Sequence, residues 1–280
     1  ELSNNDAWMR DCGPTFVVNP SGELRLVDWV FNAWGGLFNG LYSPWDLDDQ
    51  VAARVAEIAG VHRYRAPLVL EGGSIHTYGQ GTLLTTEECL LNKNRNPELT
   101  KGQIEVHLHN YLDIEEIIWL KRGVFNDETS GHVDNICCFV RPGVVALSWT
   151  EDKNDPQYGI SQECLDTLMS ATDARGRTIE VHKIHQPDPI TITKTESQGV
   201  KVQEGTLLRE EGTRLAGSYI NFYFVNGGVI VPVFNDPHDA PALATLKKLL
   251  PERKVVGVPA REILLGGGNI HCITQQQPRV

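Results

Sequence analysis

Five side chains in this sequence could together perform nucleophilic chemistry on a small cation. They are a thiol, an imidazole and three carboxylates: Cys272, His132, Glu71, Asp11 and Asp134. A thiol reacts as its thiolate, an imidazole can act as general acid and base, and a carboxylate can orient that imidazole. Two further carboxylates would disfavour an anionic substrate, but they suit a planar guanidinium, which pairs bidentately with carboxylate groups.

The surroundings of two of these residues are repeated. Glu71 begins the run Glu71–His76, and Cys272 ends the run Gly266–Cys272; both contain the pattern x-G-G-[S/N]-I-H. Such self-similarity indicates an internal structural repeat. Because one copy begins with a carboxylate and the other is followed by a thiol, we expect one scaffold position to serve two kinds of chemistry.

The elements that must position these residues also recur. Pairs of β-rich runs around Gly, Pro or Asn turns indicate hairpins, at Thr15–Val18 with Glu23–Trp29, Ile75–Tyr78 with Thr82–Thr86, Ile136–Val140 with Val144–Trp149, and Tyr219–Val225 with Val229–Phe234. A helical stretch follows each hairpin, at Leu47–Ala59, Lys101–Leu112, Ser161–Ala171 and Ala240–Leu250. A further strand follows each helix, at Arg63–Leu70, Glu116–Leu120, Thr178–Ile184 and Lys254–Val258.

The unit is therefore ββαβ, and we expect a fifth unit that begins with a strand over Asn269–Gln276 and is cut short at Val280. Repeats that cannot bury their faces alone must stack on one another. The pattern predicts an α/β propeller of five units in a single domain over residues 1–280, with the rest of the fifth unit preceding Glu1. The polar segment Gln186–Arg214 is expected to form a loop or flap.

In a pseudo-symmetric ring, equivalent positions of the units converge near the axis. The five side chains named above lie near the starts of the units, so we expect them to meet in one pocket. His132 and Asp134 would face the same side of a strand, because side chains alternate with period two. Trp34 either lines the pocket mouth or is a buried indole in a turn. His76 and His271 repeat each other, which favours a packing role for both.

Composition excludes some classes of function. The net charge of −11 argues against nucleic-acid binding, which needs a basic face, and suits a small cationic substrate. No apolar run reaches the roughly 20 residues of a membrane helix. The six cysteines include no C-x-x-C pair, so we interpret them as reduced thiols in a reducing compartment, the cytoplasm. Cys137 and Cys138 are expected to face opposite ways in one strand.

Longer motifs resemble the agmatine deiminase (agmatine iminohydrolase) family, particularly its plant-type members. They are Trp8–Phe16, Asn32–Gly36, Glu71–His76, Thr86–Pro97, Gly131–Asn135, Gly212–Tyr219 and Gly266–Gln276. The resemblance spans essentially the whole chain. It implies the pentein fold, a five-fold ββαβ propeller, and hydrolysis of agmatine to N-carbamoylputrescine and ammonia on the route to putrescine. It also implies no metal, no organic cofactor and a homo-oligomer.

The resemblance assigns roles residue by residue. Cys272 falls on the nucleophile, which would form a covalent thiouronium; His132 falls on the acid and base, and Glu71 on its orienting partner. Asp11 and Asp134 fall on the guanidinium clamps. Trp8 falls where the family packs an indole against the substrate, and we expect three further substrate-binding residues, Trp34, Gly268 and Asn269.

Three alternatives remain open at this point. A related enzyme could deiminate free or peptidyl arginine or transfer the amidino group; free arginine would need a cation for its carboxylate, such as Arg10 or Arg214. A metal hydrolase could use four possible ligands, His132, Asp134, His271 and Cys272, although their spacing matches no strong zinc motif. The chain could also be an inactive, polyamine-binding fragment.

Overall fold

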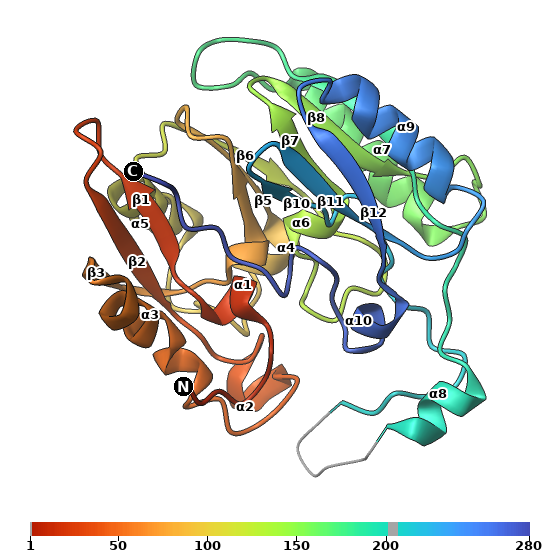
Figure 1. Cartoon of the computed structure of the whole chain (residues 1–280), viewed down its shortest axis with the longest axis horizontal. Coiled ribbons are helices and arrows are strands. Elements are labelled where there is room, and N and C mark those ends of the chain that lie inside the picture. Colours follow the sequence, from red (N-terminus) through yellow and green to blue (C-terminus); the bar gives the residue numbers. More distant parts are fainter. Residues whose placement is uncertain (1, 201–206) are drawn as a thin grey trace.

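The predicted ββαβ repeat is present in the computed structural model, which describes residues 2–200 and 207–280. Within these ranges the strands form four sheets of three strands each. In every sheet the first two strands are antiparallel and the third runs parallel to the second. Parallel neighbours need a crossover connection, and a helix lies within each one. The four sheets lie around a common centre (Figure 1).

The units have the following bounds. The first contains β1 (Thr15–Val18), β2 (Leu24–Val30), α3 (Val51–Ala59) and β3 (His62–Val69). The second contains β4 (Ile75–Thr77), β5 (Thr82–Thr86), α5 (Lys101–Leu112) and β6 (Glu116–Leu120). The third contains β7 (Cys137–Arg141), β8 (Val144–Trp149), α7 (Pro156–Ser170) and β9 (Glu180–His185), and the fourth β10 (Tyr223–Val225), β11 (Gly228–Val233), α9 (Asp239–Leu249) and β12 (Lys254–Pro259).

Local capping explains where the crossover helices begin. The α5 helix has the bounds expected from sequence, and Thr100 and Gln103 form a reciprocal capping box at its start. The α7 helix begins at Pro156, before the expected Ser161, because Asp155 caps the backbone N–H of Gln157. In the first unit, the expected helix is divided into a short 3-10 turn, η1 (Asp48–Gln50), and α3.

Each of the first three units starts with a helical turn, and two predicted strands, one in the third unit and one in the fourth, begin later than expected. These turns are α1 (Met9–Cys12), η2 (Gly72–Ser74) and α6 (Val133–Ile136), and η2 contacts both α1 and α6. The strand expected over Ile136–Val140 therefore begins at Cys137, after α6. The strand expected over Tyr219–Val225 begins at Tyr223, because the preceding backbone turns, with the N–H of Phe222 bonded to the carbonyl of Ile220.

The strand predicted over Asn269–Gln276 as the start of a fifth unit is wrong. This segment forms turns and irregular chain after α10 (Arg261–Leu265). Its backbone donors are used within turns, Ile273 to Asn269 and Thr274 to His271, rather than in a ladder. A strand needs a neighbouring strand to satisfy those groups, and none pairs with this segment in the described ranges.

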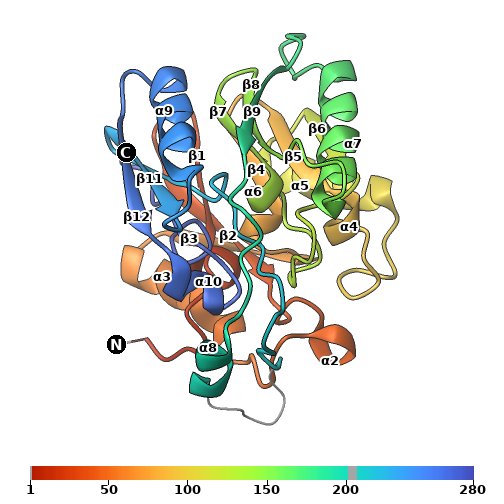
Figure 2. The same cartoon turned by 90° about the vertical axis from the view of Figure 1, so that its right-hand side faces the viewer.

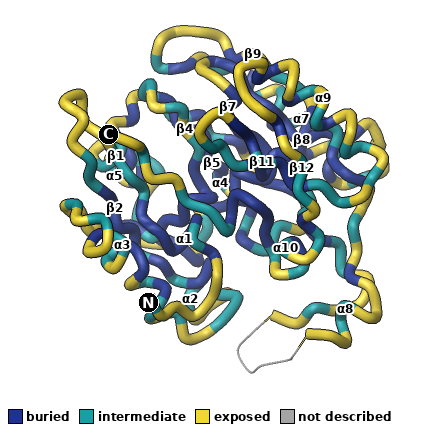
Figure 3. The backbone as a smooth tube through the Cα atoms, in the orientation of Figure 1, coloured by how far each residue is buried: buried dark blue, intermediate teal, exposed yellow. Residues whose placement is uncertain are grey.

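Three apolar cores lie between successive units. One contains Leu68 and Leu83 from the first two units, the next Leu84 and Leu147 from the second and third, and the last joins the third and fourth. Figure 3 shows these buried strands at the middle of the molecule. As predicted, the side chains of Cys137 and Cys138 face opposite ways and enter different cores.

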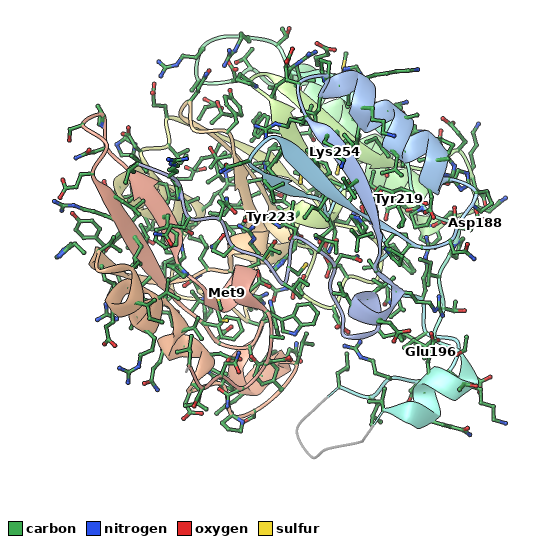
Figure 4. All side chains as sticks on the ribbon, in the orientation of Figure 1. Met9, Asp188, Glu196, Tyr219, Tyr223 and Lys254 are labelled. Carbon is green, nitrogen blue, oxygen red and sulfur yellow. The ribbon has the colours of Figure 1, made fainter. Side chains whose placement is uncertain are left out.

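The segment between β9 and β10 extends away from the sheets. It carries α8 (Lys194–Gly199), which lies apart from the four sheets in Figures 1 and 2. Asp188 and Glu196, labelled in Figure 4, lie at different places along it. Glu196 binds Arg261 at the start of α10, with 2.7 Å between Oε1 and Nε. Among the helices of the described residues, none has both the length and the apolar character needed to cross a bilayer.

Candidate active site

A cavity of about 220 Å³ opens where the starts of the units meet. Most of the predicted site residues line it: Trp8, Asp11, Trp34, His132, Gly268 and Cys272. Val200, Leu207 and Arg209 line it from the segment between β9 and β10. That segment, which was expected to form a loop or flap and also carries the short helix α8, therefore contributes to the cavity lining.

Gly73 marks the point where three of the predicted side chains converge. A Cβ atom added to Gly73 would lie 2.6 Å from Nδ1 of His132, 2.9 Å from Oδ1 of Asp11 and 2.9 Å from Oδ2 of Asp134. A side chain at this position would therefore collide with all three. The missing side chain allows α1, η2 and α6 to bring their functional groups together.

Asp11, in α1, is a buried carboxylate with two fixed oxygens. Oδ1 accepts the backbone N–H of Gly73 at 2.9 Å, and Oδ2 accepts the indole N–H of Trp34 at 2.9 Å. Burial raises the pKa of Asp11 to about 6; Asp134 and Glu71 add to the rise, and His132 opposes it. Trp34, held in a positive-φ turn, is thus both buried and at the cavity.

His132 precedes α6 and faces carboxylates on two sides. Its Nδ1 lies 3.9 Å from Oδ2 of Asp11, and its Nε2 lies 3.7 Å from Oε2 of Glu71. Burial opposes protonation of the ring, but the charges of Asp11 and Glu71 and the adjacent Cys89 outweigh it, so the pKa of His132 lies well above its ordinary value. The raised pKa favours the imidazolium form of His132, which can donate a proton.

Glu71 is fully buried and held by a cation. Nε of Arg95 lies 2.6 Å from Oε1 of Glu71, and neither side chain is exposed. Burial alone would raise the pKa of Glu71, but Arg95 and His132 keep it below the ordinary value. The ion pair therefore leaves Oε2 as a charged oxygen facing His132.

Asp134 lies in α6, so its position relative to His132 is set by a helical turn and not by the expected strand. Oδ2 lies 2.8 Å from Nδ1 of His271, whereas Oδ1 has no hydrogen-bond partner among the described residues. Burial raises the pKa of Asp134, against the opposing charges of His132 and Arg10. An orphaned buried carboxylate oxygen is costly unless a ligand satisfies it.

Cys272 is a buried thiol beside Asp134. Its Sγ lies 3.7 Å from Oδ2 of Asp134 and 3.3 Å from Nδ2 of Asn221. Burial raises the pKa of Cys272 well above that of a free thiol, as do the charges of Asp134 and Asp11, whereas the Asn269 backbone and the Asn221 side chain oppose the rise. The thiol form of Cys272 is therefore favoured over the thiolate.

The remaining predicted residues occupy different surroundings. The indole N–H of Trp8 donates to Asp6 at 3.0 Å, and its ring meets Trp34 edge to face, with 6.4 Å between centroids. Asn269 is fully buried and does not line the cavity; its side-chain oxygen and nitrogen have no partner in the part of the chain that the structure describes.

The residues of the site that were not predicted from sequence include four whose contacts bear on its chemistry: Arg95, Glu128, Arg209 and Asn221. Arg95 lies within a motif that was noticed, but nothing in its spacing indicates a pair with Glu71. Asn221 could have been found, because it stands at the start of the fourth unit, where the other units carry functional groups. Arg209 binds both carboxylate oxygens of Glu128, at 2.5 and 2.7 Å.

Within residues 2–200 and 207–280, two clusters contain ligand types that metals use. Glu71, Cys89 and His132 place one possible ligand atom each within 4.8 Å of one another, and so do Asp188, Asp236 and His238. In the first cluster Glu71 already binds a guanidinium, and His132 is an imidazolium. In the second, Asp236 accepts the N–H groups of Asp188 and His238 as part of a turn. We therefore interpret both as hydrogen-bonded networks.

These features define a class of protein: an α/β repeat fold with a cysteine-centred, carboxylate-rich site on its axis. The chain belongs to the Porphyromonas-type peptidyl-arginine deiminase family, which matches it over residues 1–278.

Individual relatives are similar over the whole chain. A protein of Listeria monocytogenes named "Putative agmatine deiminase 1" is 65% identical, covering 100% of this chain and 77% of its own length. The agmatine deiminase of Ectopseudomonas mendocina is 58% identical, with 99% and 76% covered. The solved agmatine deiminase of Enterococcus faecalis superposes with a TM-score of 0.97 at 51% identity, with 100% and 76% covered. The fold is therefore the expected pentein-type α/β propeller.

Proposed function

We propose that this protein hydrolyses agmatine to N-carbamoylputrescine and ammonia. The proposal rests on one observation: the side chains of Asp11, His132 and Asp134 meet around the space where a Cβ atom of Gly73 would lie. The Cys272 thiol lies beside Asp134. The similarity to agmatine deiminases supports the choice of substrate. The product would enter the route to putrescine.

The carboxylates of Asp11 and Asp134 would hold the guanidinium through its N–H groups. The Cys272 thiolate attacks the central carbon, forming a C–S bond and a tetrahedral intermediate. His132 donates its proton to one nitrogen, the C–N bond breaks, and ammonia leaves a thiouronium on Cys272. The neutral His132 then takes a proton from water, whose oxygen attacks the same carbon. The C–S bond then breaks and the hydroxyl proton is lost to solvent, which restores the thiolate and releases the neutral ureido product.

The charges of the site residues fit this sequence of steps. His132 already carries the proton that the leaving nitrogen needs. Cys272 is still a thiol, because burial and two carboxylates disfavour its anion. A bound guanidinium would neutralise those carboxylates and favour the thiolate. Activation of the nucleophile would thus accompany substrate binding.

The cations near the cavity favour agmatine over free arginine. Arg10 donates to the carbonyl of His271 and to two glutamine side chains, Gln275 and Gln276, and Arg214 binds Asp155. Arg209 lines the cavity, but Glu128 neutralises it. Among the described residues, no cation in the cavity lining lacks a carboxylate partner. A substrate carboxylate would therefore be poorly matched.

Three coarser properties complete the proposal. Residues 1–280 would act as one catalytic domain, which is supported by the apolar cores shared between successive units. A cytoplasmic location is supported by the six free, buried cysteines. A homo-oligomer is supported by the family resemblance. No metal or organic cofactor takes part in the proposed steps.

The test combines turnover with detection of the intermediate. Purified protein is incubated with agmatine, free arginine or a peptidyl arginine, ammonia is measured, and quenched samples are weighed as intact protein. We expect ammonia from agmatine and a transient adduct that maps to Cys272. Faster turnover of either arginine substrate would overturn the choice of agmatine, and turnover without dependence on Cys272 would overturn the mechanism.

A further inference from the structure

We infer that Asn221 is a catalytic residue whose side-chain amide donates a hydrogen bond to the Cys272 thiolate. The inference rests on the proposed role of Cys272 as nucleophile. Nδ2 of Asn221 lies 3.3 Å from Sγ of Cys272, and both residues are buried. Asn221 belongs to the turn before β10, the fourth unit's counterpart of the turns that carry Asp11 and Asp134.

The orientation of the Asn221 amide follows from its partners. Its Oδ1 lies 2.9 Å from the backbone N–H of His271, which can only donate, so this atom must be the oxygen. The opposite atom is therefore the NH₂ group. One of its hydrogens meets Oδ1 of Asn135 at 3.0 Å, and the other is directed at Cys272.

A carboxylate at the far end fixes the orientation of Asn135 as well. Nδ2 of Asn135 lies 3.2 Å from Oδ2 of Asp127. The other carboxylate oxygen of Asp127, Oδ1, accepts hydrogen bonds from Thr129, and an ionised carboxylate can only accept. Asn135 must therefore present its oxygen to Asn221. The side-chain amides of Asn135 and Asn221 therefore each have one fixed orientation between Asp127 and Cys272. Flipping either amide would place two donors or two acceptors against each other.

Among the described residues, the backbone N–H of Asn269 is a second donor that favours the Cys272 anion. Asp134 faces the thiol from α6 and Asp11 lies nearby in α1, and both carboxylates disfavour the anion; Arg10 is the cation that acts on the same group. In the resting thiol, Oδ1 of Asn221 lies 3.5 Å from Sγ and can accept the S–H. One side chain therefore serves both protonation states, accepting from the thiol and donating to the thiolate.

The experiment measures thiol ionisation directly, without substrate. Iodoacetamide labelling of Cys272 is followed against pH, with the labelled peptide identified by mass spectrometry. N221L removes the donor without adding charge, and N221D keeps the oxygen that His271 needs. We expect both to raise the pH of half-maximal labelling by about one unit or more, which is roughly ten-fold slower labelling at a given lower pH. An unchanged profile in N221L would overturn the inference, even if N221D shifts.

D127N tests whether the hydrogen bonds from Asp127 through Asn135 to Asn221 fix the amide that faces Cys272. It also provides a test if the Asn221 variants do not fold. Loss of a nearby negative charge alone would lower the labelling pH, whereas loss of the fixed amide direction would raise it. We expect a rise, smaller than in N221L, and no change or a fall would count against this role of the hydrogen bonds. The matched control is N96D, because Asn96 is a buried amide bonded only to the backbone of Val69. It should leave the labelling profile of Cys272 unchanged.

Failure of this inference is separable from failure of the proposed function. If C272A retains ammonia release from agmatine, the proposed nucleophile is wrong. If C272A is inactive and N221L labels with the wild-type profile, only the role of Asn221 is wrong. The inference is supported if N221L raises the pH of half-maximal Cys272 labelling and C272A is inactive.

Discussion

Nδ1 of His271 lies 2.8 Å from Oδ2 of Asp134. Burial lowers the pKa of His271 well below its ordinary value, so the ring is neutral, and Nδ1 must carry the hydrogen because an ionised carboxylate only accepts. The bond fixes one oxygen of Asp134 and leaves Oδ1 without a partner among the described residues. His271 was expected to have only a packing role, so its contact with Asp134 gives it a second one.

Replacing His271 by Leu should weaken the guanidinium clamp. A hydrogen bond to a charged group contributes about 1.5–3 kcal/mol, so kcat/KM for agmatine should fall roughly ten- to hundred-fold. The matched control is H76L, because His76 is the repeat counterpart and accepts the N–H of Phe139 away from Asp134. Steady-state kinetics of the two variants decide the point, and equal losses would show that His271 acts only through packing.

Replacing Cys272 by Ala should abolish turnover and leave agmatine binding intact. The carboxylates that hold the guanidinium, Asp11 and Asp134, remain in this variant. Calorimetric titration with agmatine should give a dissociation constant within a few-fold of the wild-type value, while ammonia release falls to background. Residual turnover above background would contradict the nucleophile assignment.

The acid side of the pH profile should report Asp11. Its pKa of about 6 lies above the ordinary value, so the carboxylate becomes neutral, and the clamp loses its charge, as the pH falls through 6. We expect kcat/KM to decrease below that pH, with Asp134, whose pKa is also raised, contributing in the same direction. His132 is needed protonated and therefore limits the basic side of the profile.

The W34F variant tests this assignment. The indole N–H of Trp34 stabilises the charged form of Asp11, so removing that donor should raise the pKa of Asp11 and move the acid limb to higher pH. The ring stays, so loss of packing is small. The pH dependence of kcat/KM is the measurement, and a limb that stays in place or moves to lower pH would show that Asp11 does not set it.

Replacing Arg95 by Met should destabilise the protein and slow the reaction. Breaking a fully buried ion pair leaves an uncompensated charge, here on Glu71, at a cost of about 3–5 kcal/mol. R63M is the control, because Asp28, the partner of Arg63, remains paired with Arg65. The free energy of unfolding should fall by about 1 kcal/mol or less in this variant. Urea unfolding compares the two variants, and similar losses would contradict the special status of the buried pair.

The E128Q variant tests why arginine fits poorly. Glu128 neutralises Arg209 at the cavity, so the neutral glutamine should leave a cation available to a substrate carboxylate. We expect the ratio of kcat/KM for arginine to that for agmatine to rise about ten-fold or more, since one charged hydrogen bond contributes at this level. An unchanged ratio would show that the Arg209–Glu128 pair does not govern selectivity.

The order of strands and helices was predictable, because turn residues and apolar periodicity are local signals. The starts of the units were not: α6 and the turn before β10 are too short to show a helical period, and both were interpreted as strands. Asn269–Gln276 has the side-chain pattern of a strand, but no neighbouring strand pairs with it in the described part of the chain. Strand formation depends on such a partner, which the segment's own sequence cannot reveal.

In the site, too, features that depend on nearby sequence could be predicted, whereas contacts between distant segments could not. Its acids, imidazole and thiol could be picked out by residue type and by repeated position. Arg95 could not, because its pairing with Glu71 depends on how two segments cross in space. Asn221 carries no titratable group, so its relation to Cys272 appears only once the geometry is known.

The two copies of the glycine pattern have a common consequence for what this chain can become. A Cβ atom at Gly73 would strike three functional groups, and one at Gly268 would lie 2.5 Å from the ring of Trp8 and 3.1 Å from Sγ of Cys272. Because neither glycine has a side chain, both leave room for the substrate beside the functional groups. Replacing either one with alanine would therefore place a methyl group in the space that the substrate needs. A screen for lost activity would find both positions, although neither residue has a side chain that takes part in the reaction.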